Sequence, residues 1–288
     1  LGLSLAIGIE LLPYLGLTAA LIALLWVADR IEAPRAAVFG ASAAGSTALS
    51  LLLFISPASR TLANCDALSI VHVELLTIGG AGLFLLAALP LQSRSARLAG
   101  VIALGLAVIG FAWLRHPQCL GDPSALIDPD ARRLWLANVR EARPIYRQTV
   151  PIQVATLSLP WLGLAGLVIG MMRSRDDRPL LLRWAAIGTL AAFALGFCYF
   201  QTRAGPAAQA LSITGAAMLA WALMLWSERL RTPLRAIAVC GIFILAAGIG
   251  LQQATRALPA AKVTANASPA IIANRRCALL PALRPLNA

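Results

Sequence analysis

Long runs of hydrophobic residues, separated by short polar segments, make up most of the chain. Eight of these runs are close to the roughly 20 residues that an α-helix needs to cross a bilayer. We expect them at 5–27, 36–56, 68–91, 98–114, 151–172, 180–200, 207–226 and 235–251. Backbone groups in lipid must be hydrogen-bonded within the protein, so each run is expected to be helical. The pattern therefore predicts an all-α, polytopic transmembrane helical bundle of about eight spans.

The composition supports this class. Of the 288 residues, 59% are hydrophobic and only 12% are charged, and the mean hydropathy is +0.79. Soluble domains are closer to half apolar and one quarter charged. The lipid bilayer is therefore the first expected partner.

The positive charges lie between the hydrophobic runs. The net charge is +12, but it is spread over links, so we do not expect nucleic acid as a partner. Eleven Arg residues lie in or beside the links after runs one, three, five and seven, against two after runs two and six. Short Arg-rich links usually face the cytoplasm. This predicts a multi-pass protein of the cell inner membrane, with both ends of the chain extracytoplasmic.

Two longer polar segments are then placed outside the membrane. The link 115–150 is predicted to hold a short outer-surface helix, which Asp128 and Pro129 begin and Pro144 ends near Arg143. The transmembrane helical domain covers 1–251, and 252–288 is expected to be a linker and the start of a truncated extracytoplasmic domain. Because an apolar run begins at once, we expect the chain to be an internal piece of a longer protein.

Two of the five cysteines, Cys65 and Cys119, fall in outer links. Thiols can be oxidised in an extracytoplasmic compartment. We therefore predict a disulfide between these two cysteines, with two free thiols as the alternative. The spacing of cysteines and histidines matches no metal site, so no metal ligand is predicted.

Polar residues within or beside the runs concentrate in their predicted outer halves. They are Glu10, His72, Glu74 and Gln201. Ionisable groups within a membrane are costly, and each is therefore a functional candidate. Together they predict a polar cavity open to the outside, whereas the alternative is hydrogen bonding between helices or snorkelling to the interface.

Arg203 lies in the shortest outer link, which holds it near the membrane surface. A guanidinium can grip phosphate oxygens with two parallel hydrogen bonds. We predict a phosphate-binding role for Arg203, together with Arg133 or Arg140 of the outer link. The alternative for Arg203 is contact with lipid headgroups.

Several stretches resemble a known group of proteins. They are LAIGIELLPY at 5–14, CDALS at 65–69, PQCLGDP at 117–123, LWL at 134–136 and VREA at 139–142. They resemble a family of uncharacterised bacterial polytopic inner-membrane proteins. That family is itself similar to the GT-C superfamily of polyprenyl-phosphate-dependent glycosyltransferases. This second resemblance rests mainly on architecture.

The resemblance implies a membrane glycosyltransferase that takes a polyprenyl-phosphate-linked sugar at the outer face of the membrane. In GT-C enzymes the catalytic carboxylate lies in the first outer loop, which this chain does not contain, so no catalytic residue or cofactor is predicted. Two alternatives remain open. The chain could be a transporter or lipid flippase with ion sites at Glu10, His72 and Glu74, or a non-catalytic envelope assembly subunit.

Overall fold

The computed structural model describes residues 1–121, 128–136 and 139–246, except for the side chains of Arg132 and Arg133. The predictions for the tail 252–288 lie outside these residues. Helices, and no strands, form the regular structure of the described ranges. Seven of these helices are long and apolar enough to cross a membrane. The predicted class, a polytopic helical bundle, is confirmed.

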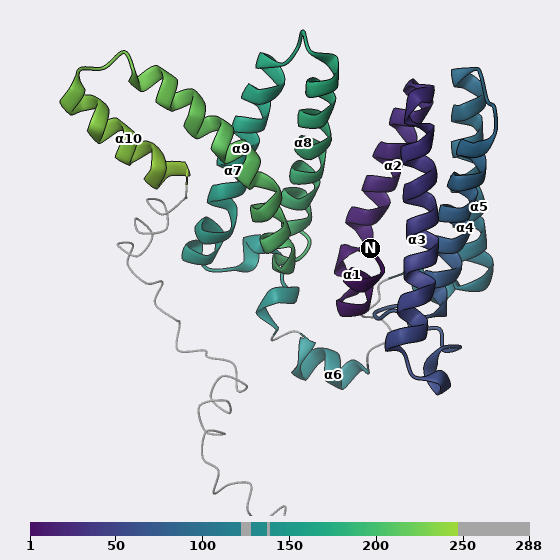
Figure 1. Cartoon of the computed structure of the whole chain (residues 1–288). Helices are drawn as coiled ribbons and strands as arrows, with labels where there is room; N and C mark the ends of the chain where they lie inside the picture. Colours follow the sequence, from purple (N-terminus) through teal and green to yellow (C-terminus); the bar gives the residue numbers. More distant parts are fainter. Residues whose placement is uncertain (122–127, 137–138, 247–288) are drawn as a thin grey trace, which may run out of the picture. The chain divides into compact units, whose positions relative to one another are not determined.

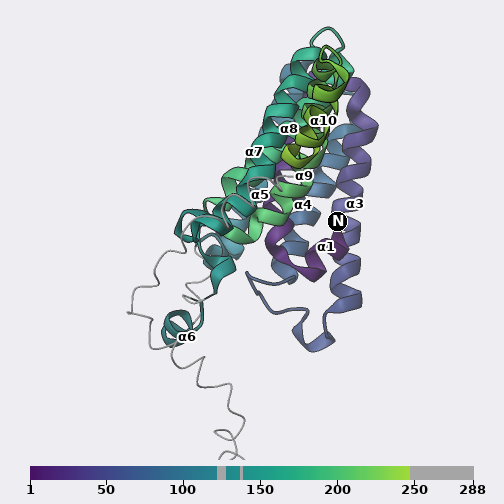
Figure 2. The same cartoon turned by 90° about the vertical axis from the view of Figure 1, so that its left-hand side faces the viewer.

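The chain divides into two compact units, Leu1–Asp128 and Pro129–Ala288 (Figures 1 and 2). The boundary falls inside the predicted outer link 115–150. The hydropathy of the spans does not reveal this division, because the spans on both sides are strongly apolar.

Unit 1 is a bundle of antiparallel helices (Figure 1). Its α-helices are α1 Gly2–Ile7, α2 Leu12–Ala28, α3 Ala33–Phe54, α4 Ile70–Ala88 and α5 Arg94–Arg115. Short 3₁₀ turns join or end them: η1 Ile9–Leu11, η2 Arg30–Glu32, η3 Pro57–Ser59 and η4 Pro117–Cys119.

The first predicted run, 5–27, is not one continuous helix. α1 ends at Ile7, Gly8 is extended with φ −171° and ψ 140°, and η1 leads into α2. Pro13 lies in the first turn of α2, where the missing N–H costs no helical hydrogen bond. The membrane-spanning part therefore covers Ile9–Ala28. Glu10 lies in the turn η1 at the beginning of this span rather than in α2.

Small residues bring α3 and α4 together. A Cβ on Gly40 would meet the carbonyl oxygen of Gly80, and a Cβ on Gly80 would meet that of Gly40. Such close backbone approach is common where helices pack in membranes.

Two links of unit 1 meet at one end of the bundle. The Arg30 guanidinium donates to Gln92 Oε1 at 2.8 Å. Arg97 is buried and donates to the carbonyl oxygens of Val27, Leu91 and Gln92. These bonds satisfy carbonyls near the ends of α2 and α4 that have no helical partner. The Arg-rich links after the first and third runs therefore share one end, as the charge pattern predicts.

Unit 2 contains α6 Pro129–Leu134, α7 Val150–Arg173, α8 Arg178–Cys198, α9 Gly205–Ser227 and α10 Thr232–Ala246, with the 3₁₀ turns η7 Arg140–Ala142, η8 Ile145–Arg147 and η9 Thr202–Ala204. α10 is the beginning of the eighth predicted run. Its described part has 15 residues, and the predicted continuation to residue 251 lies outside the described ranges.

The predicted surface helix is shorter than expected. α6 ends at Leu134 instead of continuing to Arg143, and the chain turns at Trp135. Trp135 is 62% exposed in unit 2, so it lacks the packing that would favour a longer helix.

Candidate functional site

The end of unit 1 opposite Arg97 is closed by a disulfide between Cys65 and Cys119, the pairing expected from the sequence. Their Cα atoms are 5.2 Å apart, and 54 positions separate them in the sequence. The bridge joins the link before α4 to the turn η4 after α5. The bridge therefore holds these two segments together. We call this part of unit 1 the disulfide end.

Glu74 and His116 form a close pair at the disulfide end. His116 Nε2 lies 2.7 Å from Glu74 Oε2, and the two side chains are 6% and 29% exposed. Nδ1 of His116 is buried without a hydrogen-bond partner among the described residues. The carboxylate fixes the imidazole ring through one nitrogen, which is how many catalytic and proton-carrying histidines are oriented.

His72 has a different partner. Its Nδ1 lies 3.3 Å from Ser69 Oγ, and the Ser69 hydroxyl donates to the carbonyl oxygen of Asn64 at 2.5 Å. A hydroxyl has one hydrogen, and a carbonyl can only accept. Because the Ser69 hydroxyl donates its hydrogen to the carbonyl oxygen of Asn64, His72 Nδ1 must be the donor toward Ser69.

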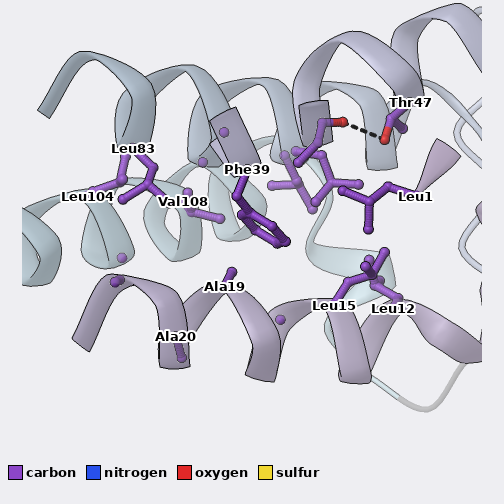
Figure 3. A pocket seen from close by; sticks show the side chains of 18 of the residues that line it. Leu1, Leu12, Leu15, Ala19, Ala20, Phe39, Thr47, Leu83, Leu104 and Val108 are labelled. Carbon is purple, nitrogen blue, oxygen red and sulfur yellow. Dashed lines mark hydrogen bonds between the residues drawn. The ribbon is translucent and has the colours of Figure 1, made fainter. Parts of the chain in front are cut away.

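An apolar cavity of about 570 Å³ lies between α2, α3, α4 and α5. Its walls are mainly Leu, Val, Ala and Gly side chains, and Figure 3 shows Leu12, Leu15, Phe39 and Leu104 among them. Among the described residues, His72 and Thr47 are the polar members of its lining, and no charged side chain belongs to it. Because the Thr47 hydroxyl already donates to Ala43 at 2.7 Å (dashed in Figure 3), His72 is the main polar feature of the lining.

Of the residues predicted to line one polar cavity, the three in unit 1 have different surroundings. His72 lines the apolar cavity, whereas Glu10 and Glu74 do not. Glu74 pairs with His116, and Gln201 belongs to unit 2 and precedes η9. The lining of the unit 1 cavity is mainly apolar, and the predicted polar cavity stays a prediction.

In unit 2, a set of hydrogen bonds ties the segment 140–148 to η9. The backbone N–H and the hydroxyl of Thr202 both donate to the carbonyl oxygen of Arg143, at 2.8 and 2.7 Å. Gln148 is buried, and its amide donates to the carbonyl oxygen of Arg140 at 2.6 Å and to the Thr202 hydroxyl at 3.1 Å. As a result η7 packs against η9.

This packing brings together two of the three predicted phosphate-binding residues. Arg140 belongs to η7 and Arg203 to η9. Arg203 also faces Glu141, with 3.8 Å between its Nε and the carboxylate, and its side chain is 43% exposed. Such an exposed and long ion pair contributes little to stability. Arg133 lies in α6, and its side chain is outside the described part of the structure.

Sequence reasoning did not single out His116, Ser69 or Gln148. The signal for His116 was present, because the chain has only two histidines and both lie at or beside the predicted outer ends of hydrophobic runs. Ser69 and Gln148 act through contacts that sequence spacing alone does not reveal.

The two arrangements suit different chemistry. The pair Glu74–His116 can hold or pass a proton, and the Arg140–Arg203 region can bind an anion. Within the described ranges, no group of three or more His, Cys, Asp or Glu side chains is placed to hold a metal ion.

Comparison with known proteins identifies no relative: no family model, curated protein or solved structure matches the chain. Its function must therefore be inferred from its own residues.

Proposed function

We propose that this chain is the membrane part of a GT-C-like glycosyltransferase that uses a lipid-linked sugar at the outer face of the membrane. The observation that best supports this proposal is the packing of η7 against η9 in unit 2, which gathers Arg140 and Arg203 from distant parts of the sequence. Negative charge develops on a lipid phosphate when it leaves the sugar, and fixed cations stabilise that charge.

The way in which Arg203 is held favours a binding role. Its neighbour Thr202 bonds to the segment 140–148 through both its backbone and its side chain. The guanidinium nevertheless stays partly exposed, and the contact of its Nε with Glu141 is 3.8 Å long. A phosphate offers a guanidinium several acceptor oxygens, which it can bind with two parallel hydrogen bonds.

The charge pattern and the disulfide support an outer location. The ends of α7 and α8 that bear Arg173, Arg175 and Arg178 lie away from η9 within unit 2 (Figure 1). If these Arg-rich ends face the cytoplasm, η9 faces outward. The bridge Cys65–Cys119 of unit 1 also fits an oxidising compartment.

The test is photolabelling of the full-length protein in nanodiscs with a diazirine-bearing polyprenyl-phosphate-linked hexose. We expect labelling of peptides from 139–150 or 199–209, strongly reduced by Arg203→Ala and only partly restored by Arg203→Lys, which cannot form the two-pronged contact. Arg175→Ala is the matched control, because Arg175 is 80% exposed at the other end of unit 2. Equal labelling of all variants, with normal expression, would refute the phosphate site.

A second candidate function is proton-coupled transport, which the pair Glu74–His116 favours. A carboxylate and an imidazole in contact within a membrane-spanning unit can share a transported proton. Proteoliposomes given an inward proton gradient should then take up protons with the wild type but not with Glu74→Gln. Sugar transfer by Glu74→Gln at the wild-type rate, without proton uptake by any variant, would instead favour the enzyme.

A further inference from the structure

The cavity of unit 1 has the size and lining of a site for one hydrocarbon chain. Its 570 Å³ falls in the range of roughly 300–1,000 Å³ that small-molecule sites occupy. No Arg, Lys, Asp or Glu from the described part of the chain belongs to the lining. A buried ion without a partner is strongly disfavoured, so a ligand with a phosphate, carboxylate or ammonium at its buried end does not fit.

His72 determines which polar group the ligand can carry. Its Nδ1 donates to Ser69, because the Ser69 hydrogen is used on Asn64. In a neutral imidazole with a proton on Nδ1, Nε2 has no proton and is an acceptor. Nε2 is therefore an acceptor, and a ligand group that hydrogen-bonds to it must be a donor.

From this geometry we propose that the cavity binds a single-chain lipid alcohol, whose hydroxyl donates to His72 Nε2 and whose hydrocarbon chain lies between α2, α3, α4 and α5. An alkane or an ether of the same length would bury the same apolar surface but leave Nε2 without a donor. The discrimination comes from one hydrogen bond in an apolar site, so we expect the alcohol to bind roughly five- to tenfold more tightly than its methyl ether.

This site is confined to unit 1 and does not depend on the phosphate site proposed for unit 2. Failure of one proposal leaves the other standing, because their ligands, residues and labelled peptides differ.

The experiment uses the full chain in nanodiscs and a diazirine-bearing long-chain alcohol, its methyl ether and the matching alkyl phosphate. We expect the alcohol to label peptides of α2, α4 and α5 with the highest affinity of the three. His72→Phe should remove the preference for the alcohol over the ether. His72→Gln, which keeps an acceptor, should retain most of that preference.

A second pair of variants tests the cavity itself. Gly16 lines the cavity, and a Cβ added there meets nothing within 4 Å. Gly16→Leu should therefore fill the space without a clash and reduce labelling by all three probes. Gly45 has the same open surroundings but does not line the cavity, so Gly45→Leu is the matched control and should label normally.

Three results would overturn the proposal. Equal affinity for alcohol and ether in the wild type would remove the role of His72. Preference for the alkyl phosphate would contradict the uncharged lining. Unchanged labelling of Gly16→Leu would place the ligand outside the cavity. A thermal unfolding curve for each variant confirms that the variants tested are folded.

Discussion

Gly166 of α7 lies directly against the backbone of Gly215 in α9, with no space for a side chain between them. A Cβ on Gly166 would overlap the Gly215 carbonyl oxygen, and a Cβ on Gly215 would overlap that of Gly163. These glycines make α7 and α9 the most closely packed helix pair of unit 2. The contact is between backbones, which cannot change rotamer to make room.

We predict that Gly166→Leu strongly destabilises unit 2. Overpacking a tight contact costs about 1–3 kcal/mol, and a backbone neighbour places this site at the upper end of the range. The measurement is the apparent melting temperature of the detergent-solubilised protein. Gly196→Leu is the control, because a Cβ on Gly196 meets nothing within 4 Å. Equal melting temperatures for both variants would contradict the packing.

Loss of the disulfide should weaken unit 1. Cys65 and Cys119 close a long loop, for which the chain-entropy model gives a stabilisation of roughly 4 kcal/mol. Cys65→Ser, or reduction of the wild type, should lower the melting temperature, whereas Cys240→Ser should not, because Cys240 is an exposed free cysteine. Peptide mass spectrometry without reduction should recover the linked pair. Recovery of both thiols free would show that the bridge does not form.

Removal of the Arg97 side chain should also destabilise unit 1. Arg97 is 3% exposed and its guanidinium satisfies carbonyls of Val27, Leu91 and Gln92. Hydrogen bonds to charged groups contribute about 1.5–3 kcal/mol each, so Arg97→Met should reduce the free energy of unfolding by on the order of 3 kcal/mol. The exposed neighbour Arg94 provides the control Arg94→Met. Similar unfolding of the two variants would show that Arg97 does not join these segments.

The charge pattern predicts opposite compartments for two exposed positions. Ala58 is exposed in η3, after the second run, and Asp176 is exposed in the link between α7 and α8. A membrane-impermeant thiol reagent applied to intact cells should label Ala58→Cys but not Asp176→Cys. Both positions should react after the cells are opened. Labelling of both in intact cells would invalidate the orientation.

The hydrophobic pattern alone determined most of the fold. Seven predicted runs correspond to apolar helices of spanning length, because in lipid only hydrogen-bonded helices satisfy the backbone of such runs. The pattern could not locate the break at Gly8 or the end of α6 at Leu134. Those boundaries depend on local hydrogen bonds and packing rather than on hydropathy.

The candidate sites were predicted only in part. Their residue types were visible in the sequence: charged or polar groups in an apolar chain, and two cysteines in links on one side. Which of them meet was decided by tertiary structure. Glu74 contacts His116, and His72 contacts Ser69, because α4, α5 and the link before α4 converge at the disulfide end. Hydropathy measures transfer into lipid, so it cannot select which faces pack together and which enclose the cavity.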